Sequence, residues 1–186
     1  MSNDINNWED QFTVTDEELN EMRDARWLFA NLVIEGHIIV IAAEPNGGKT
    51  TLFEFVATQI ARDITKKVFY VNADIASSDI RRANDKAKEG DYKLLVPDIK
   101  LGMSMNNVVK KLIETNKTIK DLRDKVYIFD TLKKMADVIN KKDIKGLMKV
   151  LRGMTAKGAT IILLAHTNKY KDSEGNPIFE GTGDVR

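Results

Sequence analysis

A glycine-rich loop between a strand-like run and a helix-like run limits what this chain can fold into. The loop matches the Walker A phosphate-binding pattern, with alanine in place of the leading glycine, and reads Ala43-Glu44-Pro45-Asn46-Gly47-Gly48-Lys49-Thr50-Thr51. Gly47 and Gly48 permit a turn whose backbone N–H groups converge on an anion, and the next helix adds the positive end of its dipole. Lys49 is placed to contact the β- and γ-phosphates, and the Thr50 hydroxyl to bind magnesium. We therefore expect ATP and Mg²⁺ at residues 44–51.

Apolar runs alternate with helix-like segments along the rest of the chain. We expect strands over residues 37–42, 67–72, 94–96, 126–129 and 160–165. We expect helices over 15–32, 49–63, 78–89, 105–115 and 143–157. Continuous apolar strands separated by helices predict an α/β fold, with a mostly parallel sheet that carries helices on both faces. The inner face of the helix after the loop is expected to consist of Leu52, Phe53, Val56 and Ile60.

Length and composition narrow the organisation of the chain. The 186 residues suit one domain over 15–186, preceded by a polar arm over 1–14. The charges of the 29 Lys and Arg residues nearly cancel those of the 28 Asp and Glu residues. The chain therefore lacks the overall positive charge that is typical of nucleic-acid-binding proteins. The absence of cysteine excludes disulfides. The sequence shows no signal peptide pattern and no membrane-spanning run, so we expect a cytoplasmic domain.

A carboxylate follows the apolar run over 126–129. Asp130 at the end of a buried strand has the Walker B form, in which it holds magnesium directly or through water. Thr131 stands where many ATPases carry a catalytic glutamate, so the base must come from elsewhere. Asp74, after the second strand, is a candidate; alternatively, Asp74 or Asp79 caps the following helix.

In its ordered set of motifs the chain resembles the RecA-like ATPases of the plasmid RepA and DnaB hexameric-helicase type. The motifs are LVIEG (32–36), the AEPNGGKTT loop (43–51), YVNAD (70–74), IFDTL (128–132) and LLAHTNK (163–169). The resemblance covers roughly residues 30 to 186. It implies a RecA-like P-loop core in which the strand before His166 lies between the P-loop strand and the Walker B strand.

The resemblance also implies roles for individual residues. Asp74 would polarise the attacking water, although it replaces the glutamate of the family and is shorter. His166 would sense the γ-phosphate, and Arg82 or its neighbour Arg81 would stack on adenine, with the register off by about one residue. The catalytic set expected is therefore Lys49, Asp74, Asp130 and His166.

Two lysine-rich segments follow the strands that would line the channel of a RecA-like ring. We interpret both as loops, with Lys133 and Lys134 followed by Lys141 and Lys142 in the first, and Lys169, Tyr170 and Lys171 in the second. Lysines and an aromatic ring suit single-stranded DNA, whereas lysine pairs on loops are also commonly just solvated. The resemblance implies a homo-oligomeric ring that acts in DNA replication.

The resemblance leaves the extent and the activity of the domain open. The family continues beyond Arg186 into a further strand and a trans-acting Arg or Lys, so either the chain is a fragment or its ring machinery is incomplete. Arg186 itself is one candidate for that group. A replicative helicase-like motor is the first interpretation. The alternatives are a nucleotide-gated switch with a protein partner and a small-molecule kinase with a lid over 76–93.

Overall fold

A five-stranded parallel sheet forms the centre of the protein. The structure is a computed structural model, and it describes residues 9–21, 24–99, 102–137 and 141–166. Neighbouring strands follow the order β3-β7-β6-β4-β5, and all are parallel. Their bounds are Ile38–Ala43 (β3), Lys67–Asn72 (β4), Lys93–Leu95 (β5), Lys125–Asp130 (β6) and Thr160–His166 (β7). The expected mostly parallel sheet is confirmed.

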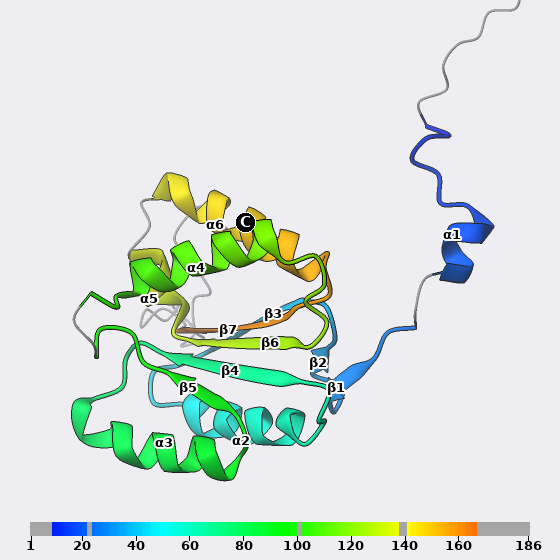
Figure 1. Cartoon of the computed structure of the whole chain (residues 1–186). Coiled ribbons are helices and arrows are strands. Elements are labelled where there is room, and N and C mark those ends of the chain that lie inside the picture. Colours follow the sequence, from blue (N-terminus) through cyan, green and yellow to red (C-terminus); the bar gives the residue numbers. More distant parts are fainter. Residues whose placement is uncertain (1–8, 22–23, 100–101, 138–140, 167–186) are drawn as a thin grey trace, which may run out of the picture.

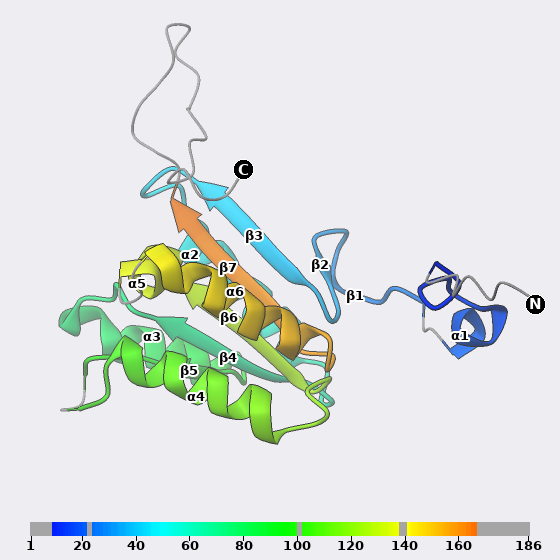
Figure 2. The same ribbon diagram turned by 90° about the horizontal axis from the view of Figure 1, so that it is seen from above.

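Helices cover both faces of this sheet (Figures 1 and 2). One face carries α2 (Lys49–Ala61) and α3 (Ile80–Glu89), the latter preceded by the 3₁₀ turn η1 (Ser77–Asp79). The opposite face carries α4 (Met105–Thr118), α5 (Leu132–Asp137) and α6 (Lys141–Thr155). Within the part of the chain described, no helix is long and apolar enough to cross a membrane.

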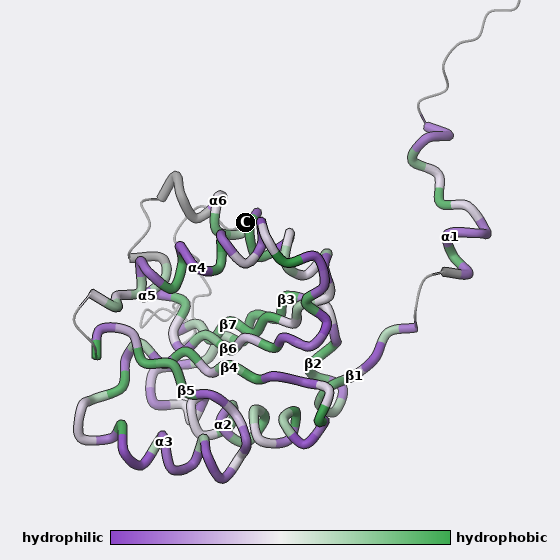
Figure 3. The backbone as a smooth tube through the Cα atoms, in the orientation of Figure 1, coloured by the Kyte–Doolittle hydropathy of each residue, from purple (hydrophilic) through white to green (hydrophobic). Residues whose placement is uncertain are grey.

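Side chains alternate between two cores, one on each face of the sheet. The α2-side core contains Phe53 and Ile60 of α2 together with Ile128 and Leu164 of the sheet. The α4-side core contains Leu151 of α6 together with residues next to Ile128 and Leu164 along their strands. Successive residues of β7, such as Ile161 and Ile162, therefore enter opposite cores, as the period of two in a strand requires. Figure 3 shows the resulting apolar strands between helices with polar outer faces.

The segment before the sheet differs from the helix expected over 15–32. The predicted cap is confirmed: the Thr15 N–H donates to Glu18 at 2.8 Å, and Thr15 Oγ1 accepts from the Glu18 N–H at 3.2 Å. The helix α1 nevertheless spans only Asp16–Glu21, and the antiparallel strands β1 (Trp27–Phe29) and β2 (Val33–Ile34) follow. Phe29 packs edge-on against Phe55 of α2, with ring centroids 6.1 Å apart. Tertiary packing therefore overrides the local preference for a helix.

Two expectations about burial also need correction. The apolar run over 37–42 is typical of a buried strand, but β3 ends the sheet order among the described strands, and Val40 is 53% exposed. Leu52 was placed on the inner face of α2, yet it is 48% exposed. The buried stripe runs through Phe53, Val56 and Ile60, and Leu52 lies one position off that stripe.

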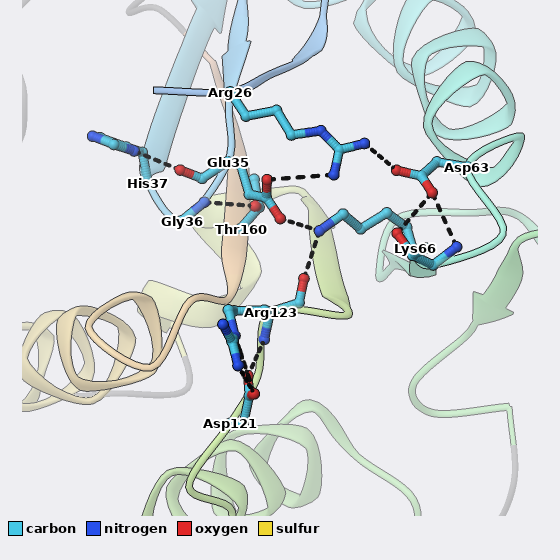
Figure 4. A network of polar contacts seen from close by, with 10 residues as sticks. Arg26, Glu35, Gly36, His37, Asp63, Lys66, Asp121, Arg123 and Thr160 are labelled. Carbon is cyan, nitrogen blue, oxygen red and sulfur yellow. Dashed lines mark hydrogen bonds and ion pairs between the residues drawn. The ribbon is translucent and has the colours of Figure 1, made fainter. Parts of the chain in front are cut away.

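A charged network fixes the amino ends of the strands, away from the edge where they finish (Figure 4). Arg26, before β1, pairs with Asp63 at 2.6 Å and with Glu35 at 3.8 Å. Glu35 also pairs with the buried Lys66, whose ammonium donates to the Arg123 carbonyl at 2.7 Å. These bonds attach the β1–β2 hairpin to the body of the domain.

Two neighbouring residues of α2 test the corrected core. Phe53→Ala should lower the free energy of unfolding by about 3–5 kcal/mol, because it opens a cavity in the α2-side core. Leu52→Ala should cost less than about 1 kcal/mol, because that side chain is half exposed. Urea denaturation measures both values. Equal losses in the two variants would contradict this assignment of the helix face.

Candidate nucleotide-binding site

The carboxyl ends of the central strands meet at one edge of the sheet. Ala43 of β3 is the register partner of His166 of β7, and Asn72 of β4 is the partner of Asp130 of β6. Strand β7 lies between β3 and β6, as the resemblance implied. This edge is the usual place for ligands in open parallel sheets, because the connecting loops and helix amino termini gather there.

The glycine-rich loop joins β3 to α2 through left-handed backbone conformations. Asn46 has φ of 62° and Gly48 has φ of 76°, and Gly48 is the residue that caps the start of α2. A Cβ atom on Gly47 would lie 3.0 Å from the Glu44 carbonyl oxygen, so that position also favours glycine. The loop therefore directs the amino terminus of a 13-residue helix toward the strand ends, which suits a phosphate.

Lys49 is held inside this loop by backbone carbonyls. Its ammonium donates to the oxygens of Ala43 at 2.7 Å and Glu44 at 2.8 Å, and the residue is 6% exposed. Burial lowers the pKa of the Lys49 ammonium, and the nearby Asp130 carboxylate opposes that shift. A buried cation with neutral acceptors suits an anionic ligand, which would supply the charge that desolvation leaves uncompensated.

Asp130 connects the Walker B strand to the loop. Its Oδ2 accepts one hydrogen bond from Thr50 Oγ1 at 2.7 Å and a second from the Tyr70 hydroxyl at 3.0 Å. The Asp130–Thr131 peptide bond is cis. Burial, and then the charge of Asp130, raise the pKa of Tyr70 far above its usual value, so this hydroxyl stays a donor. Tyr70 was assigned no role from the sequence, because its contact with Asp130 depends on the pairing of β4 with β6.

Asp74 lies just beyond β4, and donors from the Walker B segment contact it. Its Oδ2 accepts from Thr131 Oγ1 at 3.1 Å, and its Oδ1 pairs with Lys134 Nζ at 3.5 Å. These contacts do not cap a helix, so they do not support the alternative role of Asp74. Asp79 stands at the cap position of α3, but its side chain makes no capping hydrogen bond. Lys133 and Lys134 were expected in a loop, but they lie on α5; Met135, in the same turn, is buried in the α4-side core and favours the helix there.

A pocket of about 610 Å³ brings most of the predicted residues together. The predicted residues that line it are Asn46, Gly47, Gly48, Lys49, Thr50, Thr51, Asp74, Arg82, Asp130 and His166. Glu44 and Pro45 do not line it. Lys169, Tyr170, Lys171 and Arg186 lie outside the described residues, as do the side chains of Lys141 and Lys142.

Three polar residues that line the pocket were not anticipated from the sequence. They are Asn72, whose Oδ1 accepts from the Asp74 N–H at 3.2 Å, and the ion pair of Glu54 with Lys86 at 2.7 Å. Lys86 lies four residues after Arg82 on α3, so the two cations occupy the same face of that helix. The sequence shows that Arg82 and Lys86 are four residues apart. This spacing indicates part of a binding site only once α3 is known to border the pocket.

Comparison with known proteins places the chain in a family. The model of the family described as AAA domain matches residues 7–172, which is most of the chain. The chain belongs to the AAA domain family. No curated protein sequence matches it. Membership makes this AAA domain a nucleotide-binding domain of the P-loop ATPase class, in agreement with the loop and the strand edge.

Two solved structures share the fold. The flagellar accessory protein FlaH from Methanocaldococcus jannaschii is 21% identical, with a TM-score of 0.50 over 75% of this chain and 65% of its own. The ATP synthase subunit NeqB from Nanoarcheaum equitans is 14% identical, with a TM-score of 0.51 over 73% of this chain and 41% of its own. The AAA domain thus spans less than two thirds of each, and at these identities the likeness shows the RecA-like fold alone.

The P-loop lysine provides the first test of the site. Lys49→Ala should weaken ATP binding by about 30-fold or more, because removing one partner of a buried charge contact costs about 2–5 kcal/mol. Titration calorimetry measures the loss. Lys111→Ala is the control, since that exposed lysine lies on α4 and pairs with Glu114. Wild-type affinity in Lys49→Ala would contradict the assignment of this loop.

Proposed function

We propose that this AAA domain binds ATP with Mg²⁺ and hydrolyses it. The observation that carries the proposal is the 2.7 Å hydrogen bond from Thr50 to Asp130, which joins the P-loop helix to the end of the Walker B strand. The two groups come from positions 80 residues apart, and they meet beside the buried Lys49. A phosphate chain in the loop would therefore lie next to a hydroxyl and a carboxylate that suit a divalent ion.

Magnesium fits these donors. It prefers oxygen ligands and is commonly held by one or two protein groups together with substrate phosphates. Thr50 Oγ1 and the Asp130 carboxylate offer oxygen atoms that can bind a metal, and they lie within hydrogen-bond distance of each other. Asp130 is 4% exposed. Bound there, the ion would neutralise charge on the phosphates. Thr50 and Asp130 would orient it, and Lys49 would contact the β- and γ-phosphates.

Asp74 is the residue we assign to the attacking water. It lines the same pocket as Thr50 and Asp130, from the neighbouring strand β4. Its carboxylate is already engaged by Thr131 and Lys134, so it would accept a water proton best once Lys134 moves away. His166, exposed at the end of β7 and lining the pocket, is assigned to sensing the γ-phosphate. Arg82 is assigned to the adenine.

The Lys134–Asp74 pair suggests how turnover responds to a partner. Lys134 lies on α5, in the segment that the resemblance to RepA and DnaB helicases assigns to the channel of a homo-oligomeric ring. A DNA phosphate would compete with Asp74 for this half-exposed lysine and release the carboxylate. We therefore propose a helicase-like motor that single-stranded DNA stimulates. The contact between Lys134 and the Asp74 carboxylate also supports the second candidate, which is a nucleotide-gated switch. In that case a protein partner takes the place of DNA.

Hydrolysis and metal binding should separate in two carboxylate variants. Asp74→Asn should bind MgATP like wild type but turn over about 100-fold more slowly, because the base loses its charge. Asp130→Asn should weaken the magnesium dependence of ATP binding, because an amide is a poorer ligand for the ion than a carboxylate. Single-turnover assays and calorimetry measure the two effects. Normal turnover in Asp74→Asn would assign the base to another residue.

The DNA proposal is tested at Lys134. Lys134→Ala should raise the basal ATPase rate by up to about fivefold, because an exposed ion pair contributes no more than about 1 kcal/mol. It should also reduce the stimulation by single-stranded DNA. Lys111→Ala on α4 serves as the charge control. A wild-type protein that single-stranded DNA does not stimulate would contradict the motor, and a raised basal rate in Lys134→Ala would then favour the switch. A Lys134→Ala rate equal to wild type would contradict the role of the Lys134–Asp74 pair in both candidates.

A further inference from the structure

A buried tyrosine contacts the Walker B carboxylate from within the sheet. Tyr70 is 1% exposed, and its hydroxyl lies 3.0 Å from Asp130 Oδ2. Tyr70 of β4 is the register partner of Ile128, two residues before Asp130 on β6. Since side chains two residues apart share a face, the tyrosine ring and Asp130 lie on the α2 side of the sheet. The phenol is long enough to bring its hydroxyl from one register level to the next.

The position of this hydroxyl is fixed by its surroundings. The Tyr70 ring packs against Tyr92, with ring centroids 6.0 Å apart, inside the α2-side core that also contains Phe53 and Ile60. A rigid aromatic ring in a close-packed core holds its polar tip with little freedom. The hydroxyl thus presents its proton to Asp130 from a defined direction.

The carboxylate of Asp130, in contrast, has an intrinsically soft torsion. The terminal torsion of an aspartate is broad, so one hydrogen bond leaves its plane poorly defined. Here Oδ2 receives donors from two directions, Thr50 at the start of α2 and Tyr70 in the sheet. Among the described residues these are the hydrogen bonds of this carboxylate, and both fall on Oδ2. Among those residues none donates to Oδ1, so this oxygen suits a metal ion or a water bound to it.

We propose that Tyr70 is a positioning residue for the metal that accompanies ATP. Its hydroxyl holds Asp130 in the orientation that Thr50 also requires, so that both oxygen donors are in place when the metal enters. This inference rests on the proposed function, because it assumes that Asp130 holds the metal. Tyr70 itself touches neither nucleotide nor metal. Groups that orient metal ligands typically contribute about 10- to 100-fold to metal affinity.

The test is Tyr70→Phe, which removes the hydroxyl and keeps the ring. Calorimetry with ATP, at increasing Mg²⁺ and in EDTA, separates metal-dependent from metal-free binding. The Mg²⁺ concentration for half-maximal binding should rise about 10-fold, while the affinity for ATP in EDTA should stay at the wild-type value. Tyr92→Phe is the matched control: Tyr92 lies in the same core, and its substitution should change neither value.

A double variant shows whether Tyr70 acts through Asp130. In an Asp130→Asn background, Tyr70→Phe should produce no further change in metal dependence, because the group that it positions is already altered. Independent, additive losses would overturn the proposal. So would wild-type metal dependence in Tyr70→Phe alone.

A measurement on the wild-type chain covers a Tyr70→Phe variant that does not fold. The Tyr70 hydroxyl proton should be visible by NMR, and its resonance should shift when Mg²⁺ is added to the ATP-bound protein. A resonance that Mg²⁺ leaves unmoved would overturn the proposal. If the wild-type chain instead binds no ATP in a Mg²⁺-dependent way, the proposed function fails, and that result differs from every outcome above.

Discussion

Five strands running in the same direction bring Ala43, Asn72, Asp130 and His166 to one edge of the sheet, and the site depends on this register. None of these residues is near another in the sequence. A slip of one residue in β6 would turn Asp130 to the α4 side, away from Thr50. The register is protected because both faces of β6 and β7 are buried, with Ile161 and Ile162 in opposite cores. Packing on two sides thus fixes the position of the site.

The same packing explains how charged groups are held at a buried edge. Lys49 and Asp130 are each at most 6% exposed, and isolated charges would be costly there. Backbone carbonyls surround the lysine, and two hydroxyls donate to the carboxylate. Each charge is therefore solvated by fixed dipoles, which need little rearrangement when a ligand arrives. Asp74 differs, because it contacts a half-exposed lysine and a threonine near the surface.

Local signals were sufficient for part of this account. The loop over 43–51 carries its own backbone requirements, and β4 spans the predicted residues 67–72 because its apolar run has clear ends. The prediction of a helix over 15–32 was wrong. Phe29 lies in the β1–β2 hairpin and packs against Phe55, and no short-range sequence pattern predicts that hairpin. Tyr70 and the Lys134–Asp74 pair depend on the neighbouring strand and on α5, so only the folded arrangement reveals them. The roles assigned to the site residues remain predictions, for Lys49, Thr50 and Asp130 as well as for Asp74, Arg82 and His166.

The central claim is that one nucleotide and its metal are bound together where the P-loop meets the Walker B strand. Calorimetric titration of the wild-type AAA domain with ATP tests it most directly, first with Mg²⁺ present and then with EDTA. The account predicts one ATP per chain, bound substantially more tightly with Mg²⁺, because Thr50 and Asp130 would contribute only through the metal. Binding of equal strength in both conditions, or no binding at all, would contradict it.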